Sequence, residues 1–559
     1  MRTPLLESIS SATLSSGLVL VLLPLIGREC PAQSVERMSV SSSGVQGDQN
    51  SLQESALTPD GRYVVFQSDA ANLVANDANA ARDIFVRDRF SGTTTRVSLS
   101  SAGVPSNGSS TRPSISADGR WVAFESQATN LVAGDANGSS DVFLHDRLTG
   151  ATTLASVSSA GVPGNADSFS PDLSADGQWL AFGSRATNLV AAAGNGVSHV
   201  FLRELATGVT SLVSVTPAGA LENGSSGHPS LSADGRFVAF SSGSSNLLVA
   251  PSLQPGVYVR DRVAGTTVAA SLSSGGVEGN SSSSFPSISG NGTVVAFQSH
   301  ATNLVPGDTN FVADVFVRDL ALGLTERASV SSTGVQANLP SDAVGQPPRL
   351  SSDGRLVVFA SLATNLVPGS LGFPAIYRRD RVLGATSLVA RSTLGAEATG
   401  QSFSPSMSSN GRFVALSSSA DNLVPADTNG VRDVFQVDFI ELVLGQAPAV
   451  GGPFFFRVEG ALGEAGNVAV VLLSCTGTEF FPLPPGHGIQ LTPDACTTAG
   501  LELGGLFFAV IDAAGSAVTP SFPFPNLTAG FPFHAAAITL DAGVAGVRSI
   551  TAPVSFQAP

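Results

Sequence analysis

A recurring set of acidic and amide side chains is the part of this sequence best suited to chemistry. Carboxylate and amide oxygens are the ligands that hard cations prefer, and calcium takes several of them at roughly 2.3–2.6 Å. The spacing D-x-N-x-x-x-D occurs four times, as Asp77, Asn79 and Asp83; Asp135, Asn137 and Asp141; Asp308, Asn310 and Asp314; and Asp427, Asn429 and Asp433. Each of the four segments is therefore a candidate calcium site.

The same side chains have a structural alternative. Asp and Asn cap turns by accepting hydrogen bonds from nearby backbone N–H groups, and a network of such bonds would also be kept or lost as a unit. Two carboxylates per segment are few for tight calcium binding, and no glutamate follows at EF-hand spacing. Turn capping is the favoured interpretation; no cofactor is required, and calcium is the candidate ion.

Signatures of familiar enzymes are absent from the sequence. There is no G-x-S-x-G nucleophile motif, which residues 224–228 (GSSGH) miss by one position, and no H-E-x-x-H or G-x-x-x-x-G-K. Among the six histidines, His199 and His228 replace other residues of a repeated unit and are site candidates. The sequence therefore predicts that the protein is not an enzyme.

These candidate residues lie in a repeat that fills most of the chain. One glycine of the motif PSISADGRWVAF (residues 113–124) recurs at intervals of 57 to 62 residues, as Gly61, Gly119, Gly177, Gly235, Gly292, Gly354 and Gly411. Each unit has four short strand patterns and no helical period. Seven such units predict an all-β fold, a seven-bladed β-propeller over residues 34–440.

The two ends of the repeat predict how the ring closes. Residues 36–42 resemble the fourth strand of a unit, although they precede the first complete unit. The seventh unit stops after its third strand, near residue 439. We therefore expect the N-terminal strand to complete the last blade and to leave no open sheet edge.

The repeated residues carry a resemblance to a known family. S-x-D-G-R-x-V-A-F followed by D-V-F-x-x-D-R resembles the TolB-like β-propeller repeats of exported bacterial proteins, over about 400 of the 559 residues. The resemblance implies a propeller outside the cytoplasm and no single function. TolB itself carries an N-terminal α/β domain that has no counterpart in this sequence.

The segments outside the repeat predict export and a second domain. Residues 1–32 have the order of a secretory signal, with an apolar run at 14–27 that is too short to span a membrane. Removal of this signal would leave Cys475 and Cys496, for which an oxidising compartment favours a disulfide. Residues 441–453 read as a linker, and 454–559 as a small β-sandwich.

Charge and loop composition narrow the expected partners. The net charge of −15 argues against nucleic acid as a partner. The loops that connect successive units, such as 101–112, are long, polar and variable, and they share a face with the D-x-N segments. The expected function is recognition of a protein, peptide or glycan on this loop-rich face. An extracytoplasmic hydrolase or lyase, or a TolB-like envelope component, is the alternative; the oligomeric state is not indicated.

Overall fold

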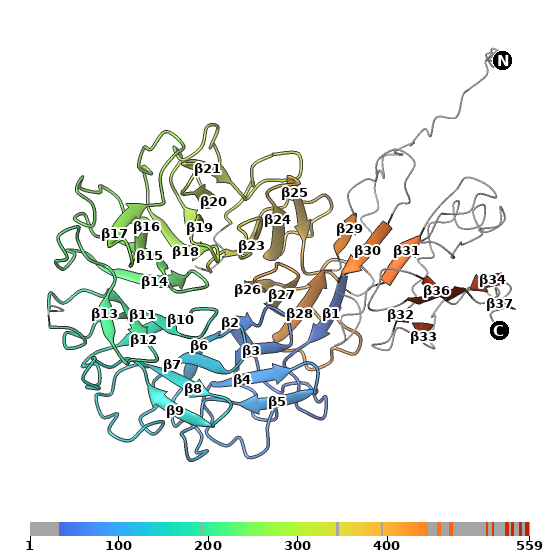
Figure 1. The fold of residues 1–559 in the computed structure, drawn as a ribbon, viewed down its shortest axis with the longest axis horizontal. Coiled ribbons are helices and arrows are strands. Elements are labelled where there is room, and N and C mark those ends of the chain that lie inside the picture. Colours follow the sequence, from blue (N-terminus) through green and yellow to red (C-terminus); the bar gives the residue numbers. More distant parts are fainter. Residues whose placement is uncertain are drawn as a thin grey trace, which may run out of the picture. The chain divides into compact units, whose positions relative to one another are not determined.

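Seven four-stranded antiparallel sheets form a ring of blades (Figure 1), so the protein is the seven-bladed β-propeller that the repeats predict. The computed structural model describes residues 33–439 except 192–193, 342–345 and 393–394, and short strands between residues 441 and 557. Every regular element in these described residues is a β-strand. None of them is a helix long and apolar enough to cross a membrane.

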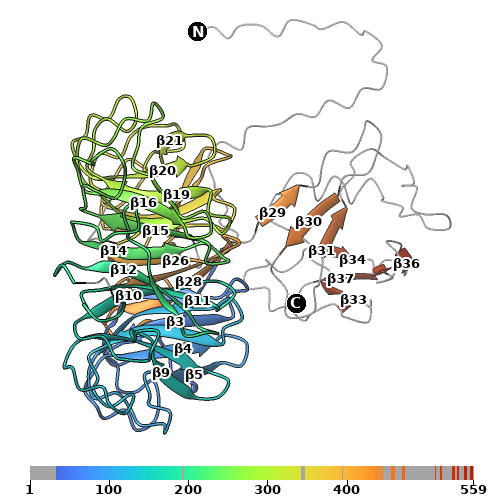
Figure 2. The same cartoon turned by 60° about the vertical axis from the view of Figure 1, so that its left-hand side comes forward.

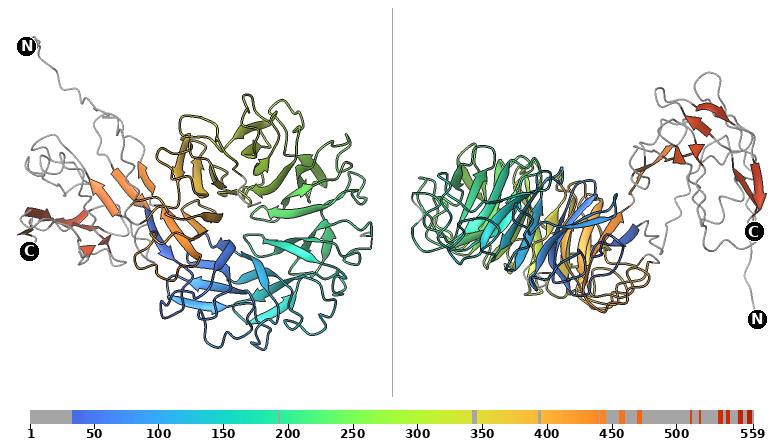
Figure 3. Two further views of the ribbon diagram at one scale, coloured as in Figure 1. Left: turned by 180° about the vertical axis from the view of Figure 1, so that it is seen from behind. Right: turned by 90° about the horizontal axis from the view of Figure 1, so that it is seen from below.

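Each blade has the same order of strands from the centre of the ring outward, which the labels of Figure 1 follow. Figure 3 shows the ring of blades from behind. Blade 1 consists of β2 (Ser51–Leu57), β3 (Tyr63–Ser68), β4 (Asp83–Asp88) and β5 (Thr93–Arg96). The strands of the next five blades are β6 (Ser110–Ile115), β7 (Trp121–Ser126), β8 (Asp141–Asp146) and β9 (Ala151–Leu154); β10 (Ser168–Leu173), β11 (Trp179–Ser184), β12 (His199–Glu204) and β13 (Thr210–Leu212); β14 (Ser226–Leu231), β15 (Phe237–Ser242), β16 (Gly256–Asp261) and β17 (Thr266–Ala269); β18 (Ser283–Ile288), β19 (Val294–Ser299), β20 (Asp314–Asp319) and β21 (Leu324–Arg327); and β22 (Arg349–Leu350), β23 (Leu356–Ser361), β24 (Ala375–Asp380) and β25 (Ala385–Leu388).

Blade 7 joins the two ends of the repeat. Its inner three strands are β26 (Ser402–Met407), β27 (Phe413–Ser418) and β28 (Asp433–Phe439). The fourth strand is β1 (Gln33–Arg37), which pairs with β28 in antiparallel register. Backbone hydrogen bonds between segments about 400 residues apart thus close the ring, and the outer edge of β28 is covered.

The S-x-D-G-R motif is a turn that also clamps two strands of a blade. In blade 2, Asp118 accepts hydrogen bonds from the Ser116 hydroxyl (2.5 Å) and the Arg120 backbone N–H (3.0 Å). The Arg120 guanidinium then donates two hydrogen bonds to Asp146 at the end of β8, at 2.9 and 2.7 Å. This bidentate pairing holds the pKa of Asp146 well below its usual value.

The hydrophobic core lies between neighbouring blades as well as within them. Phe124 of β7 stacks on Phe143 of β8 with ring centroids 5.9 Å apart, and both side chains are fully buried. They share a cluster with Val65 and Ile84 of blade 1. Seven such clusters are present among the described residues, and each combines side chains of neighbouring blades, so the core holds adjacent blades together.

Beyond the propeller, the structure describes strands only. β29 (Glu441–Leu444), β30 (Phe455–Glu459) and β31 (Ala469–Leu472) form one sheet, so part of the segment predicted as a linker is strand. Three further pairs are formed by β32 (Val510–Ile511) and β33 (Ala517–Val518), β34 (Pro532–Ala535) and β37 (Val554–Gln557), and β35 (Ile538–Leu540) and β36 (Val547–Ile550). Figure 2 labels β33, β34, β36 and β37 of these pairs. The β-sandwich stays a prediction, and residues 1–32, Cys475 and Cys496 lie outside the described residues.

Candidate functional site

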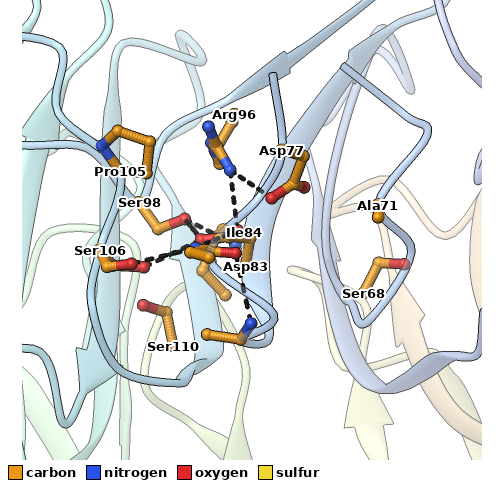
Figure 4. A network of polar contacts seen from close by, with 12 residues as sticks. Ser68, Ala71, Asp77, Asp83, Ile84, Arg96, Ser98, Pro105, Ser106 and Ser110 are labelled. Atoms are coloured by element: carbon orange, nitrogen blue, oxygen red, sulfur yellow. Dashed lines mark hydrogen bonds and ion pairs between the residues drawn. The ribbon is translucent and has the colours of Figure 1, made fainter. Parts of the chain in front are cut away.

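The D-x-N-x-x-x-D segment of blade 1 forms a closed polar network (Figure 4). Asp83 is completely buried at the start of β4. Arg96, the last residue of β5, places its Nη1 atom 3.0 Å from Asp83 and 2.7 Å from Asp77. The remaining hydrogen bonds to Asp83 come from Asn79, Ser98 and Ser106. The guanidinium therefore occupies the position between the two carboxylates that a bound cation would take.

Two of the other three segments repeat this arrangement. In blade 5, Arg327 pairs with Asp308 at 3.2 Å and with Asp314 at 3.5 Å. In blade 7, Arg37 lies 2.9 Å from Asp427 and 3.4 Å from Asp433, and Asn429 and Asn310 bond to their aspartates as Asn79 does. In these three described segments the aspartates bond to other side chains, and only the asparagines accept a hydrogen bond from a backbone N–H, as the turn-capping alternative describes.

The loops that connect successive blades lie on the same face as the D-x-N segments, and a repeated asparagine holds them in place. In blade 2, Asn130 accepts a hydrogen bond from the Asn107 backbone N–H and donates one to the Pro105 carbonyl. The equivalent bond from a backbone N–H is accepted by Asn72, Asn188, Asn246, Asn303, Asn365 and Asn422. The loops that looked free to recognise a ligand are therefore tied to the neighbouring turn in every blade.

A second candidate site lies on the axis of the ring. Inner strands enclose a cavity of about 230 Å³, and its walls include five prolines, Pro113, Pro171, Pro229, Pro286 and Pro347. The lining residues extend from the middle of the inner strand to its C-terminal end in blades 1, 2 and 3, and no lining residue comes from the first two positions of a six- or seven-residue inner strand. The cavity therefore lies toward the tight turns and away from the loop-rich face.

A β-bulge in the inner strands places varied side chains along this cavity. In blade 2 the pairing with β7 shifts between Thr111 and Ser114, and Arg112 in the bulge has φ +53°. Holding a non-glycine residue in this backbone conformation costs roughly 1–2 kcal/mol of stability. Because the conformation is repeated in other inner strands, it is a regular feature of the fold. The equivalent residues with positive φ are Glu54, Ser170, His228, Phe285 and Ser404.

Only some of the charged residues that line the cavity form ion pairs. Arg112 lies 3.4 Å from Glu54 and 3.2 Å from Glu125. Burial raises the pKa of Glu54 although Arg112 and Arg349 oppose the shift. Arg349, by contrast, has a buried Nε without a hydrogen-bond partner, and no ion pair reaches it among the described residues.

Asp172 combines a structural bond with a perturbed carboxyl group. Ser114 and Ser230 hydroxyls each accept a hydrogen bond from the backbone N–H of the next blade's inner strand, and Asp172 does the same for Leu231 at 2.7 Å. Desolvation in the cavity wall raises the pKa of Asp172 to about 6, against the attraction of Arg349. The Ser114 side chain also hydrogen-bonds to this carboxyl group.

The two histidines singled out by the repeat have different surroundings. His228 lines the cavity beside Phe285, with ring centroids 4.5 Å apart, and burial followed by the charge of Arg112 lowers its pKa to about 4. His228 is therefore neutral at neutral pH. His199 is buried in the blade 3 loop network, bonded to Glu222 (3.1 Å) and Asn195 (2.8 Å).

Sequence reasoning missed Glu54, Arg112, Asp172 and Arg349. The available signal was the pair of positions that flank the proline of the inner-strand segment in six units, and Ser55 in blade 1; these positions change from unit to unit while the residues around them repeat. Only the bulge explains why these positions face the axis, and a bulge leaves no periodic pattern.

Comparisons with known proteins give the fold and little more. No family model matches the chain, and no curated protein matches it. Similar solved structures include TolB from Acinetobacter baumannii (14% identity, TM-score 0.34, covering 62% of this chain and 64% of that one). An oligogalacturonate lyase in complex with manganese is also similar (13%, 0.45, 74% and 94%), as is a prolyl endopeptidase (12%, 0.42, 73% and 54%). TolB proteins are thus among the similar propellers, in agreement with the resemblance of the repeats.

These neighbours correct one prediction. The sequence predicted that this protein is not an enzyme, and that exclusion is wrong, because a lyase and a prolyl endopeptidase are among the similar propellers. The absence of a familiar catalytic motif does not exclude catalysis. At these identities the similarity concerns the fold and leaves the activity open.

Proposed function

We propose that this protein is an exported propeller that binds a ligand bearing a carboxylate, such as a peptide end or an acidic sugar, in its axial cavity. The observation that carries the proposal is Arg349, whose guanidinium lies in the cavity without an ion-pair partner among the described residues. A desolvated guanidinium stabilises a carboxylate through two parallel hydrogen bonds. The signal-like segment at residues 1–32 supports export.

The other walls of the cavity suit a small polar ligand with an apolar side. The prolines, Phe285 and Met407 supply rigid apolar surface, while Glu54 and Asp172 offer acceptors for hydroxyl or amino groups. A volume of about 230 Å³ is below the roughly 300–1,000 Å³ of pockets for drug-sized molecules. It matches a single sugar or the last residue of a chain.

Removing the free guanidinium should weaken binding. Replacing Arg349 by glutamine removes a charge-assisted hydrogen bond, and we expect affinity to fall by about 10–100-fold. Isothermal titration calorimetry would compare galacturonate with galactose, and peptides with free and amidated C-termini. The matched control is Arg185→Gln, at an exposed arginine outside the cavity. Equal binding of the charged and neutral partners would contradict the proposal.

Binding should also depend on pH through Asp172. Below pH 6 its carboxyl is protonated, and above pH 6 the ionised form repels the ligand carboxylate and competes for Arg349. We therefore expect affinity to fall about 3–10-fold as the pH rises from 5 to 7. Titrations of the wild type and of Asp172→Asn would test this, since the variant should lose the step. His228→Gln should keep it, because the pKa of His228 is about 4.

Acid–base catalysis in the same cavity is a second candidate. A carboxyl group with a pKa of about 6 can exchange a proton near neutral pH, which an ordinary aspartate cannot do efficiently. This would make the protein a hydrolase or lyase acting on the ligand that Arg349 holds. A panel of uronic-acid oligosaccharides and short peptides, with Asp172→Asn as the control, would detect turnover.

A further inference from the structure

Blade 2 keeps both aspartates of its segment but lacks the arginine that pairs with them elsewhere. Arg96 pairs in register with Phe85 of the third strand, and Arg37 and Phe435 are the corresponding pair in blade 7. In blade 2 the partner of Phe143 is Leu154. Since leucine carries no charge, nothing from the fourth strand neutralises Asp135 and Asp141.

The two carboxylates of blade 2 are nevertheless buried. Asp141 is fully buried and accepts hydrogen bonds from Ser156 (2.6 Å) and Asn137 (2.8 Å). Asp135 is 7% exposed, and among the described residues it has no hydrogen-bond or ion-pair partner. Burial, and then the charge of Asp141, raises the pKa of Asp135 to about 6. Such a pair is costly unless something compensates it.

Blades 3, 4 and 6 also lack the arginine, but unlike blade 2 they lack the pair of aspartates as well. Blade 3 fills the space with the hydrogen-bonded pair of His199 and Glu222. Blade 4 has Gly256 at the position of Asp141, and the Tyr258 hydroxyl bonds to Ser252 there (2.7 Å). Blade 6 uses the hydroxyl of Tyr377 in the same manner. Blade 2 alone of the seven retains buried acids without a counter-cation from the described chain.

We propose that the blade 2 segment binds a divalent metal ion, with calcium the best match, between Asp135 and Asp141. In blade 1 a guanidinium nitrogen lies within 3.0 Å of both equivalent carboxylates, which shows that the geometry accepts a cation at this point. An arginine supplies one positive charge to two carboxylates, whereas a divalent ion supplies two. Asp135, Asp141 and the oxygens of the 135–137 turn, completed by water, provide hard ligands.

Leu154 supplies the decisive test of this site. Replacing Leu154 by arginine copies blade 1 and should fill the site with the protein's own cation. We expect the wild-type full-length protein, titrated with calcium chloride after EGTA treatment, to bind one ion that Leu154→Arg loses. The affinity of that ion should fall by at least about 100-fold, because a fixed positive charge takes its place. Asp135→Asn should lose the same ion.

Two measurements distinguish the loss of calcium binding from misfolding of a variant. Isothermal titration calorimetry gives stoichiometry, and thermal unfolding of each variant in EGTA shows that it folds, since Leu154→Arg adds an ion pair and should not lower Tm. Calcium should raise the Tm of the wild type and leave that of Leu154→Arg unchanged. The proposal is overturned if wild type and Leu154→Arg bind calcium equally, or if neither binds it. The cavity variant Arg349→Gln should retain the ion, so failure of the proposed function would leave this result intact.

Discussion

Replacing Gly119 by alanine should destabilise the propeller by about 2–5 kcal/mol, through backbone strain together with overpacking. Gly119 has φ +71°, and a Cβ atom there would lie 2.4 Å from the Tyr63 ring of the preceding blade. The repeated glycine is therefore a contact between blades as well as a turn residue. The change should shift the denaturant midpoint, followed by fluorescence of Trp121 and Trp179.

Gly103 provides the matched control for this prediction. Its φ of +77° is nearly the same, but an added Cβ would have no atom within 4 Å. Gly103→Ala should therefore show only the backbone cost, roughly 1–2 kcal/mol. If the two variants lost equal stability, the close approach of Tyr63 to Gly119 would contribute nothing, and the glycine would serve the turn alone.

The fold was predictable because its information is local and repeated seven times. The turn at Asp118 and Gly119 and the alternation of the strands lie within one unit of sequence, and the incomplete first and last units are visible as soon as the units are aligned. Closure by β1 followed from residues 36–42 resembling a fourth strand. By contrast, nothing in a single unit reveals that the bulge at Arg112 aims one position of each inner strand at the axis.

The candidate site was predictable only in part, because its charges are balanced by distant residues. The D-x-N segments were visible, and so was the uncertainty between metal binding and capping. What distinguishes the segments is the end of a different strand, and for blade 7 the arginine is Arg37, about 400 residues before Asp433. A motif search within one loop cannot see that Leu154 has replaced this arginine in blade 2.

Removing Asp83 should cost about 3–5 kcal/mol, the range for a buried charge that loses its partner. In Asp83→Ala, Arg96 keeps only Asp77, and the hydroxyls of Ser98 and Ser106 lose the carboxylate oxygen that accepts their hydrogen bonds. Each buried donor left unsatisfied adds to the loss. Urea unfolding at pH 8 in EGTA would measure the change in the free energy of unfolding.

Removing the first aspartate of the blade 2 segment, Asp135, which is the counterpart of Asp77, should have the opposite effect. A pKa raised to about 6 means that the fold disfavours ionised Asp135, so its unfavourable contribution is absent below about pH 4 and complete above about pH 6. At pH 8 without calcium, Asp135→Ala should therefore leave stability unchanged or increase it, and at pH 4 this gain should vanish. With calcium present, the wild type should become the more stable of the two. A loss at Asp135 as large as that at Asp83, in EGTA, would mean that blade 2 has a counter-cation of its own and needs no metal.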